Sequence, residues 1–255
     1  MKKIIPGAQV VHRVSALLRE LAKKQESGAR LVDLYKALDL EQPTAYRLMQ
    51  ALVIEGLAHQ DTQSKKYFLG PLITELSMAR KTHFDLQKIA FSSLERIASQ
   101  TEDTVYLVTQ SRYETVCIER LEGSYPVKVL TLDIGDRRPL GVNATGLSIL
   151  SALENAQARE IIEANAKQYP KYNLTKEEVS QIVCQARNDK YVCVSIAPGT
   201  TTLGVPILGT DMQPVGAVAV AAIATRMEAK RRNEIINILR VEKNNIEEKI
   251  RKLIQ

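Results

Sequence analysis

The chain has 255 residues, a mass of 28.4 kDa and a net charge of +6, which is long enough for two domains. Its 45% hydrophobic and 25% charged residues are the balance of a folded globular protein, which excludes a disordered chain. The longest apolar run, residues 215–224, is too short to span a membrane, and the cysteine and histidine spacings fit neither a disulfide framework nor a metal site. We therefore expect a cytoplasmic protein with no membrane partner, no metal and no cofactor.

The charge is unevenly distributed along the chain. Residues 1–80 carry 12 basic and 8 acidic side chains, residues 81–225 carry 14 and 16, and residues 226–255 carry 9 and 5. A basic N-terminal third indicates a polyanion partner for that part of the chain. An ordinary solvated surface gives the same pattern, so charge alone leaves both interpretations open.

The first 70 residues are expected to form three helices and a hairpin. Apolar residues at spacings of three and four predict helices from Val10, from Leu31 and from Pro43, and Gly56 is placed to end the third. Two short strands are expected at 57–59 and 66–69, around a polar turn. This order is typical of a winged helix-turn-helix, and the alternative is a three-helix bundle whose third helix is merely solvated.

Polar side chains on the outward face of the third helix can reach base edges and phosphates in a major groove. The N-terminus of that helix directs partial positive charge outward, and two lysines of the hairpin can contact flanking phosphates. His59 is either a further phosphate contact or an ordinary surface histidine. The predicted DNA-binding residues are Gln42, Thr44, Tyr46, Arg47, Gln50, Lys65 and Lys66.

The remainder of the chain predicts an α+β domain. A long helix over 71–99 is expected to join a first domain, residues 1–70, to a second, residues 100–255. In the second domain we expect strands at 104–109, 115–121 and 127–132, helices at 144–153, 156–166 and 175–188, strands at 191–196, 202–207 and 215–224, and a basic helix from about residue 227. Strands, then helices, then strands indicate helices packed over a sheet. The apolar stripes of helices 10–25 and 72–97 favour dimerisation, unless both are buried within one chain.

Four motifs occur in the order found in one known family. Residues 42–58 and 66–70 resemble the recognition helix and wing of the IclR family of bacterial transcriptional regulators. Residues 134–146, 198–207 and 215–218 are similar to the signatures of its second domain. The resemblance covers residues 8–253. It implies a winged helix-turn-helix, a linker helix and a GAF/PAS-like α/β effector-binding domain. Members of this family act as dimers or tetramers that a small metabolite modulates, and are not enzymes.

The resemblance also implies an effector pocket, and the chain departs from the family pattern there. Leu147 stands where a lysine is common, Ala219 and Ala221 where serines are common, and the loop at 194–197 carries no carboxylate. The effector-binding residues that the resemblance implies are Tyr106, Asn143, Ala144, Thr145, Gly146, Cys193, Thr202, Ala219 and Ala221. We predict a small, apolar or aromatic carboxylate, held by helix amides without a cationic side chain. Neutral drift in a pocket that binds something else is the alternative.

Two functions of different class remain. The first is a ligand-responsive regulator that binds a two-half-site operator as a homodimer or as a tetramer built from dimers. The second is an enzyme acting on a small acid or ester, with the winged helix as a protein-interaction module. No catalytic residues are predicted, because Cys117 and Cys193 have no adjacent histidine base. Asp133 and Asp136 flank a turn next to the arginines at 137–138, where solvated charge or an ion pair is more typical than a catalytic carboxylate pair. Retardation of duplex DNA by the purified protein would separate the two hypotheses.

Overall fold

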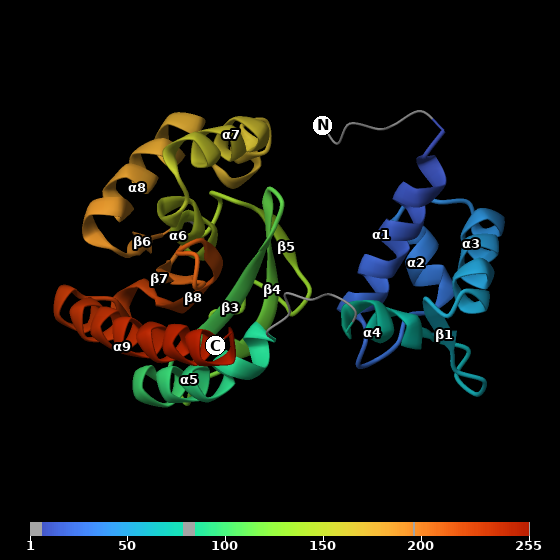
Figure 1. Ribbon diagram of the computed structural model, residues 1–255, viewed down its shortest axis with the longest axis horizontal. Helices are drawn as coiled ribbons and strands as arrows, with labels where there is room; N and C mark the ends of the chain where they lie inside the picture. The colour runs from blue at the N-terminus through green and yellow to red at the C-terminus, as the bar shows by residue number, and fades with distance from the viewer. Residues whose placement is uncertain (1–6, 79–84, 196, 255) are drawn as a thin grey trace. The chain divides into compact units, whose positions relative to one another are not determined.

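A computed structural model describes residues 7–78, 85–195 and 197–254. The chain divides into two compact units, with the boundary between residues 83 and 84, and each is described by itself (Figure 1). Within the described residues no helix is both long and apolar enough to cross a bilayer.

The first unit contains the predicted helices and hairpin. Its elements are α1 (Gln9–Lys23), α2 (Leu31–Ala37), α3 (Gln42–Ile54), β1 (Ala58–Gln60), β2 (Tyr67–Leu69) and α4 (Pro71–Met78). β1 and β2 pair antiparallel as a two-stranded wing. Leu17 and Leu21 of α1, Leu34 of α2, and Met49 and Leu52 of α3 form the buried core, so the apolar periodicity correctly located the inward faces.

Two glycines determine how the wing joins the helices of the first unit. Gly28 has φ of +69°, and a Cβ there would lie 2.5 Å from the ring of Phe68, so only glycine lets the wing approach this turn. Beside it, Ala29 and Tyr67 exchange backbone hydrogen bonds of 2.9 and 2.8 Å. Gly56, with φ of +71°, follows the last turn of α3, as predicted.

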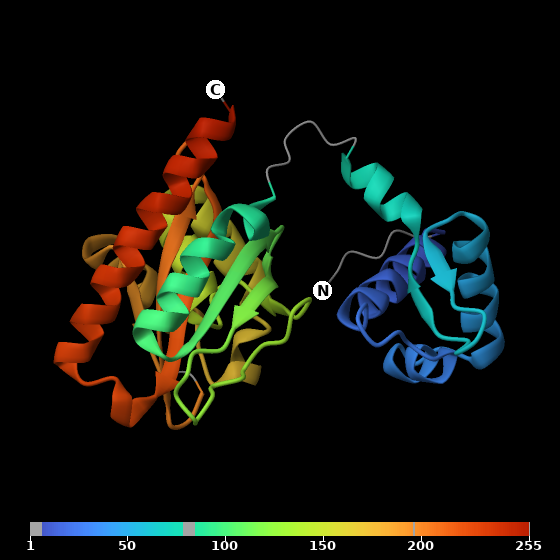
Figure 2. The ribbon, with the colours of Figure 1, turned by 90° about the horizontal axis from the view of Figure 1, so that it is seen from below.

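The second unit is a three-layer structure around one antiparallel sheet (Figures 1 and 2). Its strand order is β5-β4-β3-β8-β7-β6, and every neighbouring pair is antiparallel. The strands are β3 (Thr104–Ser111), β4 (Glu114–Leu121), β5 (Arg137–Pro139), β6 (Val192–Val194), β7 (Thr200–Leu208) and β8 (Pro214–Ile223). The helices are α5 (Leu86–Thr101), α6 (Ala144–Ala152), α7 (Asn155–Asn165), α8 (Lys176–Asp189) and α9 (Ala229–Ile254), with single 3₁₀ turns η1 (Tyr169–Tyr172) and η2 (Ala224–Arg226).

The helices cover the two faces of the sheet separately. α5 and α9 pack on one face, where Leu203, Val205, Val218 and Val220 are buried against them. α6, α7 and α8 lie over the other face around a second buried cluster. Figure 2 shows α5 and α9 running side by side along their face of the sheet. The chain therefore has the α+β architecture that the order of elements predicted.

The expected linker over 71–99 is not one continuous helix. Asp85 has an extended backbone, and its carboxylate accepts a hydrogen bond of 3.1 Å from the Lys88 amide, so it caps the start of α5. Leu86, Ala90 and Leu94 of α5 are buried on the sheet of the second unit. The prediction was wrong at Asp85, and the apolar stripe beyond it is buried within one chain. The part of the predicted helix at 79–84 lies outside the described residues.

The strand expected at 127–132 is not formed. Residues 122–136 are irregular, and the Tyr106 hydroxyl holds them by donating to the Val129 carbonyl at 2.5 Å and accepting from the Thr131 amide at 2.9 Å. Val129 and Leu132 are buried beside Tyr106, which explains the apolar pattern that suggested a strand. A side chain thus satisfies backbone groups that strand pairing would otherwise satisfy. The short edge strand β5 follows instead.

Candidate functional site

The outward face of α3 is polar and accessible. Gln42, Tyr46 and Arg47 are exposed, with half of the Tyr46 side chain open to solvent, and Thr44 is half-buried. Glu41, at the N-cap, makes no side-chain cap, so the first amides of α3 keep their capacity to bind an anion. Gln50 is half-buried and lies beside the Tyr67 hydroxyl, whose pKa is raised above its ordinary value mainly by burial. Gln50 is therefore less open to solvent than the other positions.

The two lysines expected on the wing differ in their surroundings. Lys65 is exposed at the end of the turn, where Asp61 accepts hydrogen bonds from the amide and hydroxyl of Ser64 at 2.7 and 2.6 Å. The Lys66 ammonium donates to the Ser27 carbonyl at 2.7 Å. Lys66 thus fastens the wing to the turn after α1, whereas we had expected it to extend toward a phosphate. His59 is exposed on β1.

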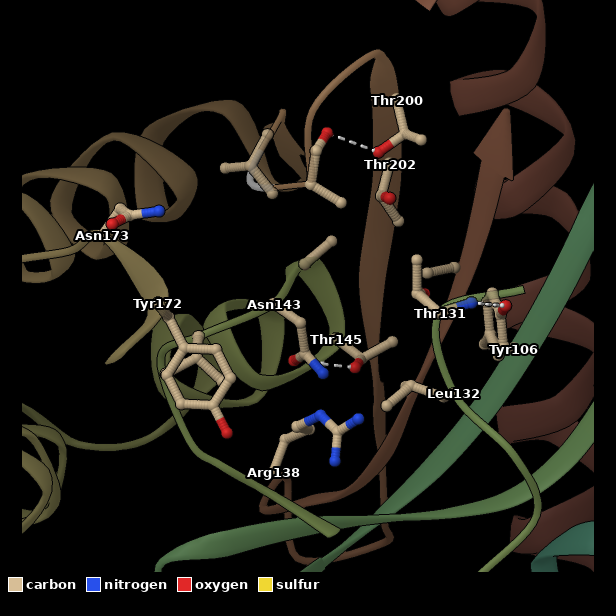
Figure 3. A pocket seen from close by; sticks show the side chains of 15 residues that line it. Tyr106, Thr131, Leu132, Arg138, Asn143, Thr145, Tyr172, Asn173, Thr200 and Thr202 are labelled. Atoms are coloured by element: carbon tan, nitrogen blue, oxygen red, sulfur yellow. Dashed lines mark hydrogen bonds between the residues drawn. The ribbon is translucent and has the colours of Figure 1, made fainter. Parts of the chain in front are cut away.

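A cavity of about 250 Å³ lies between the sheet and the start of α6 (Figure 3). Its walls come from β3, β5, β6, β7, β8, α6 and the loops at 131–132, 172–173 and 197. The lining residues are Tyr106, Thr131, Leu132, Arg138, Val142, Asn143, Ala144, Thr145, Tyr172, Asn173, Val194, Ala197, Thr200, Thr202 and Ala219. Six residues of the implied effector pocket therefore line this one cavity: Tyr106, Asn143, Ala144, Thr145, Thr202 and Ala219.

Three other residues of the implied pocket do not line this cavity. Cys193 packs toward α9, because its neighbours Val192 and Val194 face α6–α8 and successive strand residues point to opposite faces. Ala221 shares a face with Ala219, as the strand period predicted, but it is buried in a cluster with Tyr106, Val129 and Leu132. Gly146 lies within the helix, where a Cβ would come 2.9 Å from Asn143 Oδ1.

Some of the polar groups at the start of α6 already form hydrogen bonds with one another. Asn143 is the N-cap, and its Oδ1 accepts from the Gly146 amide at 2.8 Å and from the Thr145 hydroxyl at 3.1 Å. These two donors fix the orientation of the Asn143 amide, because only an oxygen can accept them. The Nδ2 atom of Asn143 is buried, and among the described residues it has no hydrogen-bond partner. A buried unpaired donor costs about 1–3 kcal/mol, so this nitrogen favours an acceptor in the cavity.

Two features of the cavity differ from what the sequence suggested. Tyr106 lines the cavity, but its hydroxyl already binds the backbone of the 129–131 segment. The cavity also has a cationic residue, since Arg138 lines it. The guanidinium of Arg138 donates to the Arg137 carbonyl at 3.0 Å and lies 3.5 Å from Asp136 Oδ2.

Sequence reasoning missed nine of the lining residues, and two signals could have found some of them. Val194 pairs with Thr202 across β6 and β7, and cross-strand partners share a face. Arg138 is adjacent to Arg137 in a strand, so one of the two had to face the helices. Tyr172 ends the 3₁₀ turn η1 and Asn173 follows it, and no periodicity in the sequence places these two residues at the cavity.

The cysteine and the two aspartates considered for catalysis are either buried or held in ion pairs. Cys117 is buried, and burial raises the pKa of its thiol to about 12, so it remains protonated. Asp136 pairs with Arg138, as expected, whereas Asp133 pairs with Arg120 of β4 and not with either arginine at 137–138. Within the described ranges no group of three or more His, Cys, Asp or Glu side chains could hold a metal ion. The absence of a metal and of a cofactor stays a prediction.

Comparison with known proteins identifies both parts of the chain. Residues 78–247 match the family model described as the bacterial transcriptional regulator IclR C-terminal domain, and residues 10–62 match the IclR helix-turn-helix domain. The chain is 23% identical over 230 residues to the HTH-type transcriptional regulator XynR of Escherichia coli, covering 88% of this chain and 90% of XynR. It is 26% identical over 209 residues to the regulator KipR of Bacillus subtilis, covering 79% and 81%.

Solved structures share the whole fold. An IclR transcriptional regulator from Alicyclobacillus acidocaldarius matches with a TM-score of 0.74 and 19% identity, covering 94% of this chain and 98% of that one. An IclR homologue from Microbacterium hydrocarbonoxydans, solved in complex with 4-hydroxybenzoate, matches with a TM-score of 0.74 and 20% identity, covering 95% and 99%. Because one family model alone spans well over half of the chain, this protein belongs to the IclR family and is a transcriptional regulator with an N-terminal DNA-binding domain and a C-terminal effector domain.

Proposed function

We propose that this regulator binds a two-half-site operator as a homodimer and that a small apolar or aromatic carboxylate in the cavity modulates it. The observation that carries the effector class is the cavity itself, in which a cation and an unpaired amide donor lie among apolar walls. Binding pockets commonly combine apolar walls with a few well-placed polar groups.

The size and lining of the cavity favour a compact, mostly apolar ligand. Its volume of about 250 Å³ is below the range of about 300–1,000 Å³ typical of pockets for drug-sized ligands. Leu132, Val142, Val194 and Ala219 supply apolar wall, which suits an aromatic ring better than a polyhydroxylated sugar acid. The fold relative from Microbacterium hydrocarbonoxydans was solved with 4-hydroxybenzoate, a ligand of this class.

The proposed operator contact is the exposed face of α3. Arg47 carries a permanent charge there, and Thr44, Tyr46 and Gln42 flank it. A recognition helix contacts base edges through its N-terminal residues, which is where these side chains lie. Lys65 extends the basic surface onto the wing, whereas Lys66 is held by Ser27.

Dimerisation is supported by apolar residues that the first unit leaves exposed. Val10 and Val11 of α1 are 57% and 66% exposed, and Leu76 of α4 is 58% exposed. Each dimer would present two copies of α3, spaced for half-sites about 34–36 Å apart or a multiple of it. Light scattering at micromolar concentration tests this: a strict monomer that binds DNA one-to-one would contradict the dimer.

Arg47→Ala tests the DNA-binding surface. The change should weaken binding to duplex DNA from the protein's own upstream region by about 1–3 kcal/mol and reduce the dependence of affinity on salt. Glu55→Ala, at the other end of α3, is the matched control and should not weaken binding. Unchanged affinity and salt dependence in the Arg47 variant would show that α3 does not read the operator.

The effector class is tested by thermal shift with two panels of compounds. Aromatic acids should raise the melting temperature and change operator affinity, whereas sugar acids should do neither. Stabilisation by sugar acids alone would contradict the proposed class while leaving the DNA-binding proposal intact.

A further inference from the structure

Arg138 is the charged side chain of the cavity that the sequence did not single out. It lies in the edge strand β5, next to Arg137, and the two side chains point to opposite faces of the sheet. Arg137 Nε binds Glu114 Oε2 at 2.9 Å and does not line the cavity. Arg138 lines it and is about one-third exposed.

The guanidinium of Arg138 keeps donors available for a ligand. An arginine has five N–H donors, and in the described residues Arg138 uses one for the Arg137 carbonyl and one in a long contact of 3.5 Å with Asp136. Asp136 also accepts from the Asp133 amide at 3.2 Å, so its oxygen is shared. These two contacts leave the remaining N–H donors, in the plane of the guanidinium, able to hold a carboxylate.

A second donor lies on the same side of the cavity. Asn143 Nδ2 is buried and without a partner among the described residues, and its orientation is fixed by the two donors that its oxygen accepts. Figure 3 shows Arg138 and Asn143 between Tyr172 and Leu132, whereas Thr200 and Thr202 lie on the opposite side of the view. The cavity is therefore polar at both ends but cationic at one.

From this arrangement we infer that Arg138, assisted by Asn143 Nδ2, is the residue that binds the effector's carboxylate and makes the cavity select acids over neutral analogues. The inference rests on the carboxylate effector proposed above. A carboxylate offers acceptor oxygens to both donors, whereas a carboxamide of the same shape lacks the charge that pairs with the guanidinium. The ring of the ligand then lies against Leu132, Val142 and Ala219, with its far end toward Thr202.

Calorimetric titration of the full-length protein with benzoate and benzamide tests this assignment. Arg138→Gln should lower benzoate affinity at least tenfold and change benzamide affinity less than twofold, and Arg138→Lys should restore part of the loss. Arg137→Gln removes a neighbouring charge on the other face and should leave both affinities unchanged. Retained benzamide binding shows that the Arg138 variant is folded.

The outcomes separate this inference from the proposed function. If the wild-type protein binds benzoate and Arg138→Gln binds it equally well, Arg138 is not the carboxylate-binding residue, although the effector class stands. If Arg138→Gln loses benzoate and benzamide alike, the residue supports the shape of the cavity and the inference is wrong. If the wild-type protein binds neither benzoate nor another aromatic acid, the proposed carboxylate class of effector and this inference are both wrong.

Discussion

The two faces of the central sheet use the same strands for different purposes. On the face toward α5 and α9, β7 and β8 place Leu203, Val205, Val218 and Val220, which are all buried in a continuous core. On the opposite face the intervening positions are small or hydroxylated, with Thr202 and Ala219 on the cavity wall. One face therefore consists of large aliphatic residues and the other of residues that leave space.

The small residues also bring α6 close to the sheet. A Cβ at Gly204 would lie 2.9 Å from the Ser148 hydroxyl and 3.1 Å from the Ala144 carbonyl, so glycine permits this contact between β7 and α6. Because α6 is held there, the cavity opens beside its N-terminus instead of along the whole face. The difference between the two faces shows that a strand period of two can encode packing and binding in a single segment.

The largest expected effect concerns packing on the α5–α9 face. Leu203→Ala should lower the free energy of unfolding by about 2–5 kcal/mol, since it removes fully buried atoms from a packed core. Thr202→Ala, at the next position and on the other face, is the control and should change it by less than about 1 kcal/mol. Chemical denaturation followed by circular dichroism measures both. Equal losses would show that the two faces do not differ in packing.

The same substitution at two positions of β8 sharpens this comparison. Ala219→Phe directs a ring into the cavity and should weaken benzoate binding at least tenfold while leaving operator binding intact, because α3 belongs to the other unit. Ala222→Phe directs the ring into the packed α5–α9 core and should instead cost about 1–3 kcal/mol of stability. Calorimetry and thermal melting distinguish the two results. A full effector response in the Ala219 variant would contradict the cavity as the binding site.

The α5–α9 face should also have its own dependence on pH. The Arg96 guanidinium, which binds Glu242 at 2.6 and 2.8 Å, lowers the pKa of that carboxyl from 4.5 to about 2. A carboxyl whose pKa is lowered by folding stabilises the protein above its unfolded pKa, and this contribution disappears as the pH falls from about 4.5 toward 2. Because Arg96 is 44% exposed, we expect a loss of about 1–2 kcal/mol, less than the full pKa shift implies. Glu242→Gln should flatten this part of the stability profile, whereas Glu248→Gln should flatten it much less, because the pair of Glu248 with Lys252 is exposed and screened by solvent.

The smallest effect is expected at the hydroxylated end of the cavity. Thr202→Val keeps the shape of the side chain but removes its hydroxyl, so it should reduce the preference for 4-hydroxybenzoate over benzoate by about fivefold, the equivalent of one hydrogen bond. Thr201→Val is the control, because the Thr201 hydroxyl contacts Ser195 at 2.9 Å and does not line the cavity. Calorimetry with the two acids measures the ratio. An unchanged ratio in the Thr202 variant would place the ring hydroxyl elsewhere.

Local patterns determined most of the fold. The helical period located α1, α2 and α3 and their buried faces. The helix expected at 175–188 is α8, and a capping box starts it: the Thr175 hydroxyl accepts from the Glu178 amide at 3.2 Å, and the Glu178 carboxylate accepts from the Thr175 amide at 2.7 Å. Local patterns also gave wrong predictions where two different structures share one sequence pattern. The apolar segment at 127–132 suggested a strand, but a side chain from β3 holds it as a loop. The linker pattern continued through Asp85, where a cap starts a new helix.

The sequence by itself determined the winged helix-turn-helix, the α+β second domain and the polar face of α3, because each depends on residues close together in the chain. Only the tertiary structure decided the cavity. Its walls join β3, β5, β6, β7, β8 and α6 with the connecting segments between them, so Arg138 and Tyr172 enter it through long-range packing that no period in the sequence describes. For the same reason Cys193 and Ala221, which are close in the chain to residues of the cavity, do not line it. Cys193 is partly buried against the α5–α9 core, and Ala221 is buried in a cluster with Tyr106.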